Sequence, residues 1–401
     1  MPKTKFAKNT HLLTSHPEGL VVLFFTELWE RFSYYGMRAI LVLYLVSQTD
    51  SSNPGLGWSN AEAIKLYGWY TALVYISCIP GGIIADRFLS NQNAVFLGGL
   101  LLCFGHLSLA FQNMVFFYFG LILIIVGVGL LKPSISSLVG SLYKENDMKR
   151  DQGFTIFYIG INIGAFLASI LVGYVGEVYG WHYGFSMAGI GMVIGQTFFF
   201  LGRKRIREFK IKKKSISKYK LTFQEIDRIK LIIISSFILI IFWASFEQAG
   251  GLMNIFAYQK TDRFLELINF EVPASWFQSI NPFMIITLGF YVSLFWYYLE
   301  LKKIVNSSII KIAIGIIIMG LGFIFMFFAS LEYEIYGKSS MFWLVLAYLF
   351  HTIGELCASP VILSYITKLS PKQLVSPIMG IYFAAIGIAE LMQAQEAAFS
   401  A

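Results

Sequence analysis

Charged residues are scarce in this sequence. Asp, Glu, Lys and Arg make up 13% of the 401 residues, whereas soluble domains contain about 25%. Hydrophobic residues make up 57% of the chain, and its mean hydropathy is +0.66. So few charges on so apolar a chain exclude a soluble globular protein, and we interpret it as an integral membrane protein.

Disulfide frameworks, metal clusters and processing signals are also lacking. The three cysteines, Cys78, Cys103 and Cys357, all lie in apolar runs, so we expect no disulfides and no metal site. We find neither a nucleotide-binding glycine loop nor a nucleophile with its base, so the sequence predicts no enzyme and no cofactor. Segment 1–19 has no apolar core or cleavage site and is not a cleavable signal peptide. The net charge of +8 is concentrated in one loop, so we expect no nucleic-acid partner.

Long apolar runs are abundant. A membrane-spanning helix needs about 20 predominantly apolar residues, and eleven such runs are present. They cover 19–47, 62–85, 94–112, 114–142, 153–177, 182–202, 230–257, 282–300, 308–330, 341–366 and 376–394. Six precede and five follow the basic segment 203–229. Two sets of helices joined by such a linker are typical of the major facilitator fold, whose site lies at the midplane between the halves.

The distribution of basic residues gives the orientation. Lys and Arg precede the first run and follow every even-numbered run, whereas the opposite loops around 50–60, 178–181, 258–280 and 331–339 hold only Lys260, Arg263 and Lys338. By the positive-inside rule the N-terminus is cytoplasmic. We therefore predict an all-α membrane protein of two helical bundles. Its parts are a cytoplasmic tail (1–18), a six-helix bundle (19–202), a basic linker (203–229) and a C-terminal bundle (230–401).

The eleventh run decays into a polar stretch. After PIMGIYFAAIGIAE the chain continues as LMQAQEAAFSA, and no twelfth span follows. Each half of a major facilitator protein has six helices. We therefore expect that the second half lacks its sixth helix and that this chain is a truncated product.

Segment Thr26–Arg38 places four charges inside the first span. Its charged and aromatic members on one side are Glu27, Glu30, Arg31, Tyr34, Tyr35 and Arg38. At about 100° per residue, all six fall within an arc of roughly 140°. An ionised side chain at the bilayer centre costs at least about 2.5–3.5 kcal/mol, so such residues normally face the protein interior and mark a pathway. The alternative is a cluster that only ties helices together, which seldom needs so many groups on one face.

Further polar groups lie deep in other spans. They are Tyr75, Lys132, Asn162, Glu247, Asn281 and Glu355. Asn162 could equally serve packing, whereas a buried lysine such as Lys132 needs a carboxylate partner. A Glu that exchanges a basic partner for a proton is a proton switch. Acids, bases, amides and rings together suit a zwitterion such as a peptide, and a simple anion would leave the carboxylates without a role.

Segment TELWERFSYYG resembles the ExxERFxYYG signature of the proton-dependent oligopeptide transporters (the POT/PTR family), a branch of the major facilitator superfamily. Other segments resemble further motifs of that family in the same order, namely GGIIADR, GVGLLKP, FYIGINIG, FWASFEQ, FQSINP and GELCASP. The resemblance extends over residues 18–388. It implies a proton-coupled symporter that imports di- and tripeptides by alternating access.

The resemblance also implies roles for single residues. Proton coupling would involve Glu27, Glu30, Arg31, Lys132 and Glu247. Gating salt bridges would join Arg38 to Glu247 and Lys132 to Glu355. Peptide contacts would come from Tyr34, Tyr35, Tyr75, Asn162, Asn281, Glu355 and Tyr382. Tyr382 stands where bacterial relatives often carry Trp, and Gly68 stands where animal relatives carry His.

From the same resemblance we expect a monomeric multi-pass protein of a bacterial inner membrane, driven by the proton gradient. Its partners would be di- and tripeptides, protons and the lipid bilayer. Two alternatives stay open. One is a family member that moves another small solute or an anion, and the other is a truncated, transport-inactive member.

Overall fold

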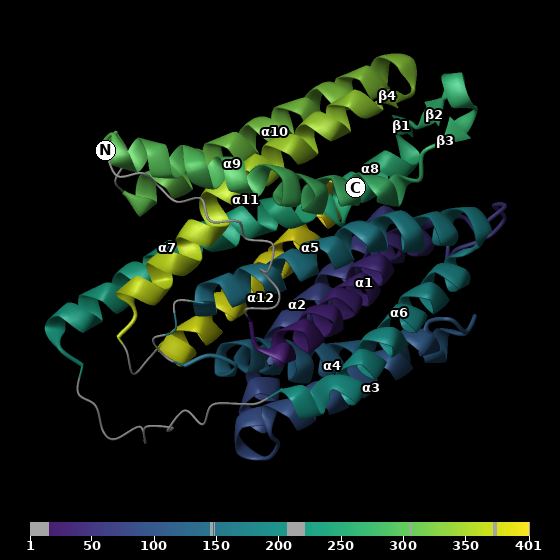
Figure 1. Ribbon diagram of the computed structural model, residues 1–401. Helices are drawn as coiled ribbons and strands as arrows, with labels where there is room; N and C mark the ends of the chain where they lie inside the picture. Colours follow the sequence, from purple (N-terminus) through teal and green to yellow (C-terminus); the bar gives the residue numbers. More distant parts are fainter. Residues whose placement is uncertain are drawn as a thin grey trace.

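A computed structural model describes residues 16–144, 147, 149–206, 221–304, 307–371 and 375–400, and these are almost entirely helical (Figure 1). The α-helices of this part are α1 (Glu18–Val46), α2 (Asn60–Arg87), α3 (Asn91–Ser108), α4 (Met114–Ser141), α5 (Lys149–Tyr174), α6 (Trp181–Gly202), α7 (Phe223–Phe246), α8 (Leu252–Gln259), α9 (Ile280–Leu301), α10 (Ser308–Tyr336), α11 (Met341–Leu369) and α12 (Val375–Ser400).

The eleven expected spans are confirmed in the described part of the chain, with α7 and α8 together forming the seventh. Eight helical stretches there are long and apolar enough to cross a membrane. Helix α1 is not one of them, although it lies inside the bundle. Its apolar length is interrupted by the charges of its central turns, which must therefore be accommodated by the protein interior.

Run 230–257 suggests one continuous helix for the seventh span, but the structure shows two helices with a break between them. Helix α7 ends at Phe246, a 3-10 turn η4 (Glu247–Ala249) follows, and α8 begins at Leu252. Gly250 and Gly251 lie between them. A Cβ atom at Gly250 would lie 2.1 Å from Oη of Tyr67 and 3.2 Å from Nη2 of Arg38, so only glycine lets the chain come this close to α1 and α2. The break therefore sets Glu247 at a helix end.

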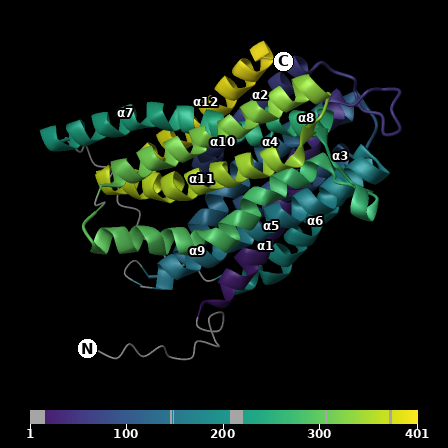
Figure 2. The same cartoon turned by 90° about the horizontal axis from the view of Figure 1, so that it is seen from above.

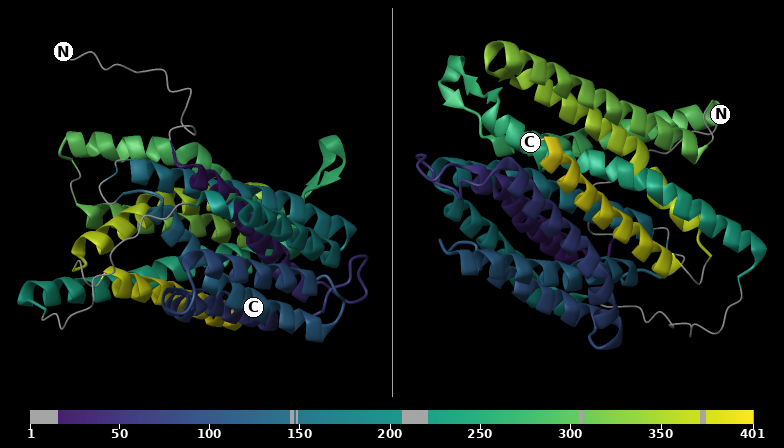
Figure 3. Two further views of the ribbon diagram at one scale, coloured as in Figure 1. Left: turned by 60° about the horizontal axis from the view of Figure 1, so that its bottom comes forward. Right: turned by 180° about the vertical axis from the view of Figure 1, so that it is seen from behind.

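The helices form two bundles, α1–α6 and α7–α12, of the major facilitator type. In the first, α1 packs on α5 and α6, and α4 on α2 and α3; in the second, α10 packs on α11 and α12 on α7. Helix pairs α2–α12 and α5–α9 join the two bundles. Figure 2 shows α5 beside α9, and the right panel of Figure 3 shows yellow α12 lying along the N-terminal helices.

Two short strand pairs lie at one end of the bundle, at the upper right of Figure 1. Strand β1 (Thr261–Asp262) pairs with β4 (Ser339–Ser340) in parallel, and β2 (Phe264–Leu265) pairs with β3 (Phe270–Glu271) in antiparallel fashion. The 3-10 turn η6 (Ala274–Ser279) follows and leads into α9. Sequence patterning over two residues is too short to predict such strands.

A carboxylate of the N-terminal bundle caps η6. Glu177, on the π-helical turn η2 (Val175–Tyr179) that follows α5, accepts hydrogen bonds from the backbone nitrogens of Ala274 and Ser275, both at 2.8 Å. The hydroxyl of Ser275 donates to it at 2.6 Å, and Nη1 of Arg263 lies 3.7 Å away. Free N–H groups at the start of a helical turn favour such an anion. We call this contact the η6 latch.

At the other end of the bundle, His16 anchors the start of α1. Its Nδ1 lies 2.9 Å from Oη of Tyr143, which follows α4. Burial raises the pKa of Tyr143 to about 12. Burial also lowers the pKa of His16, and Lys149 adds to that effect. The neutral imidazole is therefore the form that the folded chain favours.

Candidate functional site

Three charges of α1 form one cluster. Arg31 donates to both carboxylate oxygens of Glu30, with Nη2 2.6 Å from Oε1, and its Nε lies 3.3 Å from Oε1 of Glu27. All three side chains are buried, and Oε2 of Glu27 has no hydrogen-bond partner among the described residues. Two buried carboxylates thus share one guanidinium. The cluster carries an excess negative charge unless it binds a proton, and burial penalises such a charge.

Close packing fixes this face of α1. A Cβ atom at Gly164 of α5 would lie 2.2 Å from the carbonyl oxygen of Leu28, so the two helices touch beside the cluster. The Arg31 guanidinium carbon lies 5.2 Å from the ring centroid of Tyr34 and 5.8 Å from that of Tyr35. Aromatic faces at these distances attract a cation. The rings and α5 therefore hold Arg31 in place.

Lys132 faces this cluster from α4 without pairing with it. Its Nζ lies 4.2 Å from the ring centroid of Tyr75 on α2, and it forms no ion pair with any described residue. Glu27 and Glu30 are nevertheless close enough for electrostatic interaction with it. The implied salt bridge between Lys132 and Glu355 is absent from this conformation, because each of the two contacts other groups.

Arg38 and Glu247 are brought together, as the resemblance implied. Nη2 of Arg38 donates to Oε2 of Glu247 across the junction of α1 and η4, and Nε donates to the hydroxyl of Tyr67. Arg38 is 5% and Glu247 7% exposed. A buried, hydrogen-bonded ion pair between two bundles holds them together as long as both charges persist.

Glu355 is held within the C-terminal bundle. The amide of Asn281 donates to its Oε2 at 2.8 Å and to the hydroxyl of Thr352 at 3.1 Å. Glu355 is buried, and Tyr35 and Tyr158 of the N-terminal bundle are within electrostatic range. Asn281 thus orients a carboxylate toward the other bundle.

The remaining predicted contacts line the same interior. Tyr382 of α12 is buried in an apolar cluster with Phe242, and Tyr75 of the other bundle packs against that cluster. The amide of Asn162 donates to the carbonyl oxygen of Tyr158 at 3.0 Å, a bond within its own helix, and Oη of Tyr34 has no hydrogen-bond partner among the described residues. Within this part of the chain, Asn162 therefore has a local bond and the phenol of Tyr34 has none.

Three buried residues with polar groups, Glu390, Gln393 and Tyr67, were missed by the sequence reasoning. Glu390 and Gln393 of α12 are both 0% exposed; Glu390 ends the apolar run, and Gln393 lies in the stretch interpreted as its decaying end. The available signal was spacing, because Glu390 follows the buried Tyr382 and Ile386 at intervals of four residues. Tyr67 was missed because a tyrosine gives no charge signal.

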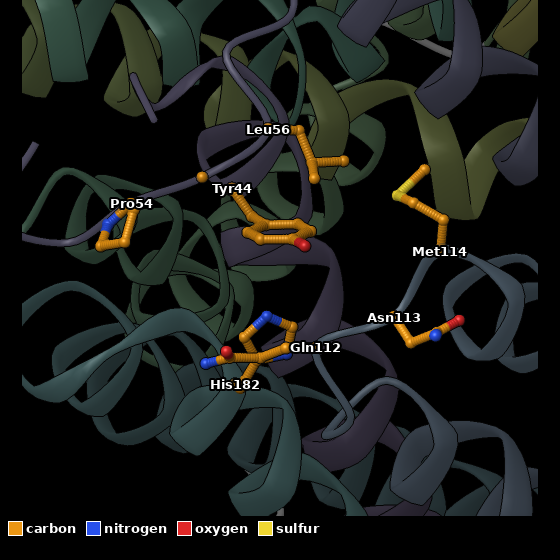
Figure 4. Close-up of a pocket in the computed structure, with 8 residues that line it drawn as sticks. Tyr44, Pro54, Leu56, Gln112, Asn113, Met114 and His182 are labelled. Atoms are coloured by element: carbon orange, nitrogen blue, oxygen red, sulfur yellow. The ribbon is translucent and has the colours of Figure 1, made fainter. Parts of the chain in front are cut away.

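Two cavities lie away from this polar interior, among the loops and helix ends of the N-terminal bundle. One of about 230 Å³ is lined by Tyr44 of α1, His182 of α6 and the loops around Leu56 and Asn113 (Figure 4). A second, of about 450 Å³, shares His182 with it. Both are lined by loop residues and contain none of the predicted site residues.

The charges of the interior do not balance. Among the described residues the buried acids of the interior are Glu27, Glu30, Glu247, Glu355 and Glu390, and the bases facing them are Arg31, Arg38 and Lys132. Five carboxylates against three cations leave an excess of two negative charges if all groups are ionised. Since a buried uncompensated charge is costly, the interior suits groups that bind protons or a cationic ligand.

Known proteins resemble this chain over most of its length. The family model described as PTR2, POT family, matches residues 92–224 and 221–401. The uncharacterized transporter YclF of Bacillus subtilis (strain 168) is 38% identical over 441 residues, covering 95% of this chain and 88% of that protein. The peptide transporter YePEPT of Yersinia enterocolitica is 35% identical, with coverages of 94% and 86%. A crystal structure of peptide transporter POT in complex with sulfate is similar with a TM-score of 0.86 at 34% identity, with coverages of 96% and 89%.

Proposed function

The chain belongs to the POT family, and on that premise we propose that it is a proton-coupled symporter that imports di- and tripeptides. Family membership makes it a multi-pass membrane transporter and not an enzyme. The observation that carries the finer proposal is the buried cluster of Glu27, Glu30 and Arg31. Because two carboxylates share one guanidinium there, a proton is the simplest ion that neutralises the excess charge.

The substrate would lie between the bundles with its two charged ends on opposite sides. Lys132 of α4 is available to a peptide carboxylate, because none of the described carboxylates forms an ion pair with it. Glu355 of α11 is available to a peptide ammonium and is oriented by Asn281. The distance between these two groups would limit the backbone length that binds. Tyr34, Tyr35, Tyr75 and Tyr382 would contact side chains, and Asn162 would contact the peptide backbone.

Alternating access would proceed by rocking of the two bundles. In the present conformation the junction of Arg38 and Glu247 and the η6 latch close one end. By the distribution of basic residues this is the extracellular end, with the N-terminus cytoplasmic. Protonation of Glu247 would remove the ion pair and allow this end to open. We propose a bacterial inner membrane as the location, the four parts 1–18, 19–202, 203–229 and 230–401 as the organisation, and a monomer as the working unit.

The test is uptake of a labelled dipeptide by proteoliposomes under an inward proton gradient. We expect accumulation that is abolished by a protonophore and competed by unlabelled di- and tripeptides. An N-acetylated dipeptide should compete at least tenfold more weakly, because it lacks the ammonium that Glu355 would bind. Equal competition by inorganic anions and peptides, or no uptake above the gradient-free control, would contradict the proposal.

A variant tests the coupling step. Glu30→Gln keeps the shape of the side chain but removes the group that shares Arg31 with Glu27, so gradient-driven accumulation should be lost while exchange of internal for external peptide persists. The matched control is Glu334→Gln, which changes an exposed glutamate of α10. Equal loss of accumulation and exchange in Glu30→Gln would indicate a purely structural role.

A further inference from the structure

Glu390 is a buried carboxyl group that the proposed mechanism does not use. It is 0% exposed on α12, and neither of its carboxylate oxygens accepts a hydrogen bond from the described residues. Thr71 of α2 lies beside it, but the Thr71 hydroxyl donates to the backbone oxygens of Tyr67 at 3.0 Å and Gly68 at 3.2 Å. Because the Thr71 hydroxyl proton is used in these bonds, the Thr71 oxygen can only accept a hydrogen bond from Glu390 and cannot donate one to it.

The polar surroundings of Glu390 belong to the junction of α1 and η4. The side chain of Gln393, one turn further along α12, has no hydrogen-bond partner in the described part of the chain, and a Cβ atom at Gly251 would lie 2.4 Å from its Nε2. Helix α12 also contacts η4 directly. The charged and phenolic groups that face Glu390 are Tyr34 and Arg38 of α1, Tyr67 and Tyr75 of α2, Lys132 of α4, and Glu247 of η4.

The charges around Glu390 determine whether its carboxyl group is protonated. Arg38 is already neutralised by Glu247, with which it forms a hydrogen-bonded ion pair. A second ionised carboxylate beside that pair would be buried without a donor, which is strongly unfavourable. A protonated carboxyl group would instead donate to an acceptor such as Thr71. Glu390 therefore holds a proton while Arg38 pairs with Glu247.

We propose that Glu390 and Glu247 share one proton and alternate as the counter-ion of Arg38. In the conformation described here Glu247 is the carboxylate and Glu390 the carboxylic acid. When Glu247 gains a proton, an O–H bond forms there, and the corresponding O–H bond at Glu390 breaks so that its carboxylate pairs with Arg38. Arg38 stays protonated, and the net charge of the three groups remains zero at both stages.

The exchange would lower the barrier to opening. Once Glu247 is protonated, η4 is no longer held by Arg38, and without a second acid Arg38 would be left buried and unpaired. Glu390 of α12 would offset part of that penalty. This regulation rests on the proposed function, since it concerns the gate of a transporter. The protonation exchange itself is a property of the purified chain.

Infrared spectroscopy of the full chain in detergent tests the exchange without any substrate, so its outcome is independent of whether peptides are transported. A protonated carboxyl group has its own carbonyl stretch, distinct from that of a carboxylate. We expect Glu390→Gln to lose one such band relative to the wild type. Glu247→Gln should lose the same band, because Glu390 then ionises to pair with Arg38.

The matched control is Glu334→Gln, whose exposed carboxylate contributes no band of that kind and which should match the wild type. A band that persists in Glu247→Gln, or a Glu390→Gln spectrum identical to that of the wild type, would overturn the proposal. If Glu390→Gln does not yield monodisperse protein, Glu390→Asp replaces it and should shift the band rather than remove it. The Glu247→Gln comparison decides the question in either case.

Discussion

Removing the Glu247 carboxylate should open the junction between α1 and η4. In Glu247→Gln the buried Arg38 loses its ion pair. Removing one partner of a buried pair costs about 3–5 kcal/mol. Because Glu390 lies beside Arg38 and offsets part of that loss, we take the lower limit, about 3 kcal/mol. At about 1.4 kcal/mol per tenfold change, the ratio of closed to open molecules should fall about 100-fold.

Ala257 provides a reporter of this opening. It lies on α8 and is 0% exposed. Three residues before it, the amide of Asn254 donates to the carbonyl oxygen of Ala39 on α1 at 2.9 Å. In a chain that carries Ala257→Cys and lacks its native cysteines, the labelling rate by a polar maleimide follows the fraction of open molecules. Glu247→Gln should raise that rate by about 100-fold.

Two further variants make the measurement decisive. Glu300→Gln removes the carboxylate that pairs with Lys311, but the Glu300 side chain is half exposed, and such pairs contribute only about 0–1 kcal/mol. It should leave the labelling rate nearly unchanged. The double variant Arg38→Gln, Glu247→Gln removes both charges and should label more slowly than Glu247→Gln alone. If Glu247→Gln labels at the rate of Glu300→Gln, the ion pair does not hold the bundles together.

Three further predictions follow from other contacts. Glu177→Gln weakens the charge-assisted hydrogen bonds of the η6 latch, worth about 1.5–3 kcal/mol, so the same labelling rate should rise about 10-fold or more; an unchanged rate would assign the latch no part in closure. Asn281→Ala removes the donor that orients Glu355 and should weaken dipeptide binding, measured by calorimetry, about 5- to 100-fold, whereas unchanged affinity would exclude that positioning role. Since burial lowers the pKa of His16 below 6.5, the stability that its neutral form gives is lost as the pH falls below that value. The melting temperature of His16→Gln should therefore decline less than that of the wild type on acidification, and parallel declines would contradict this.

The sequence was sufficient for the helical architecture and for the charged face of α1. Hydropathy alone placed the eleven spans, because the bilayer requires runs of about 20 apolar residues. Helical periodicity placed Glu27, Glu30, Arg31 and Arg38 on one arc, and the structure brings the first three into contact. Both inferences rest on local regularities, which need no knowledge of partners from elsewhere in the chain.

Interactions between helices were harder to predict. A run of apolar residues cannot reveal that Gly250 and Gly251 interrupt the seventh span, because the interruption arises where Tyr67 and Arg38 approach the backbone. Likewise, the family resemblance implied a salt bridge between Lys132 and Glu355, but Lys132 contacts an aromatic ring and Glu355 contacts an amide instead. A charged side chain with several partners nearby contacts different ones in different conformations. A transporter adopts more than one conformation.

Glu390 shows where hydropathy misleads. Its surroundings, IAELMQAQ, are less apolar than the rest of the predicted run 376–394, and for that reason the chain after Glu390 was interpreted as the decaying end of that span. In the structure this face of α12 lies against α2 and η4, where Glu390 and Gln393 are fully buried. A polar residue within a span is better interpreted by its spacing from buried neighbours than by its effect on mean hydropathy.

One arrangement occurs twice along α1. Arg31 faces two carboxylates, Glu27 and Glu30, and Arg38, two helical turns later, faces Glu247 and Glu390. Both carboxylates of Arg31 lie on α1 itself, so an exchange of counter-ion there requires no movement of helices. Those of Arg38 lie on η4 and α12, so an exchange there must displace one helix relative to another. The first cluster is therefore suited to binding a proton, and the second to converting a protonation change into opening.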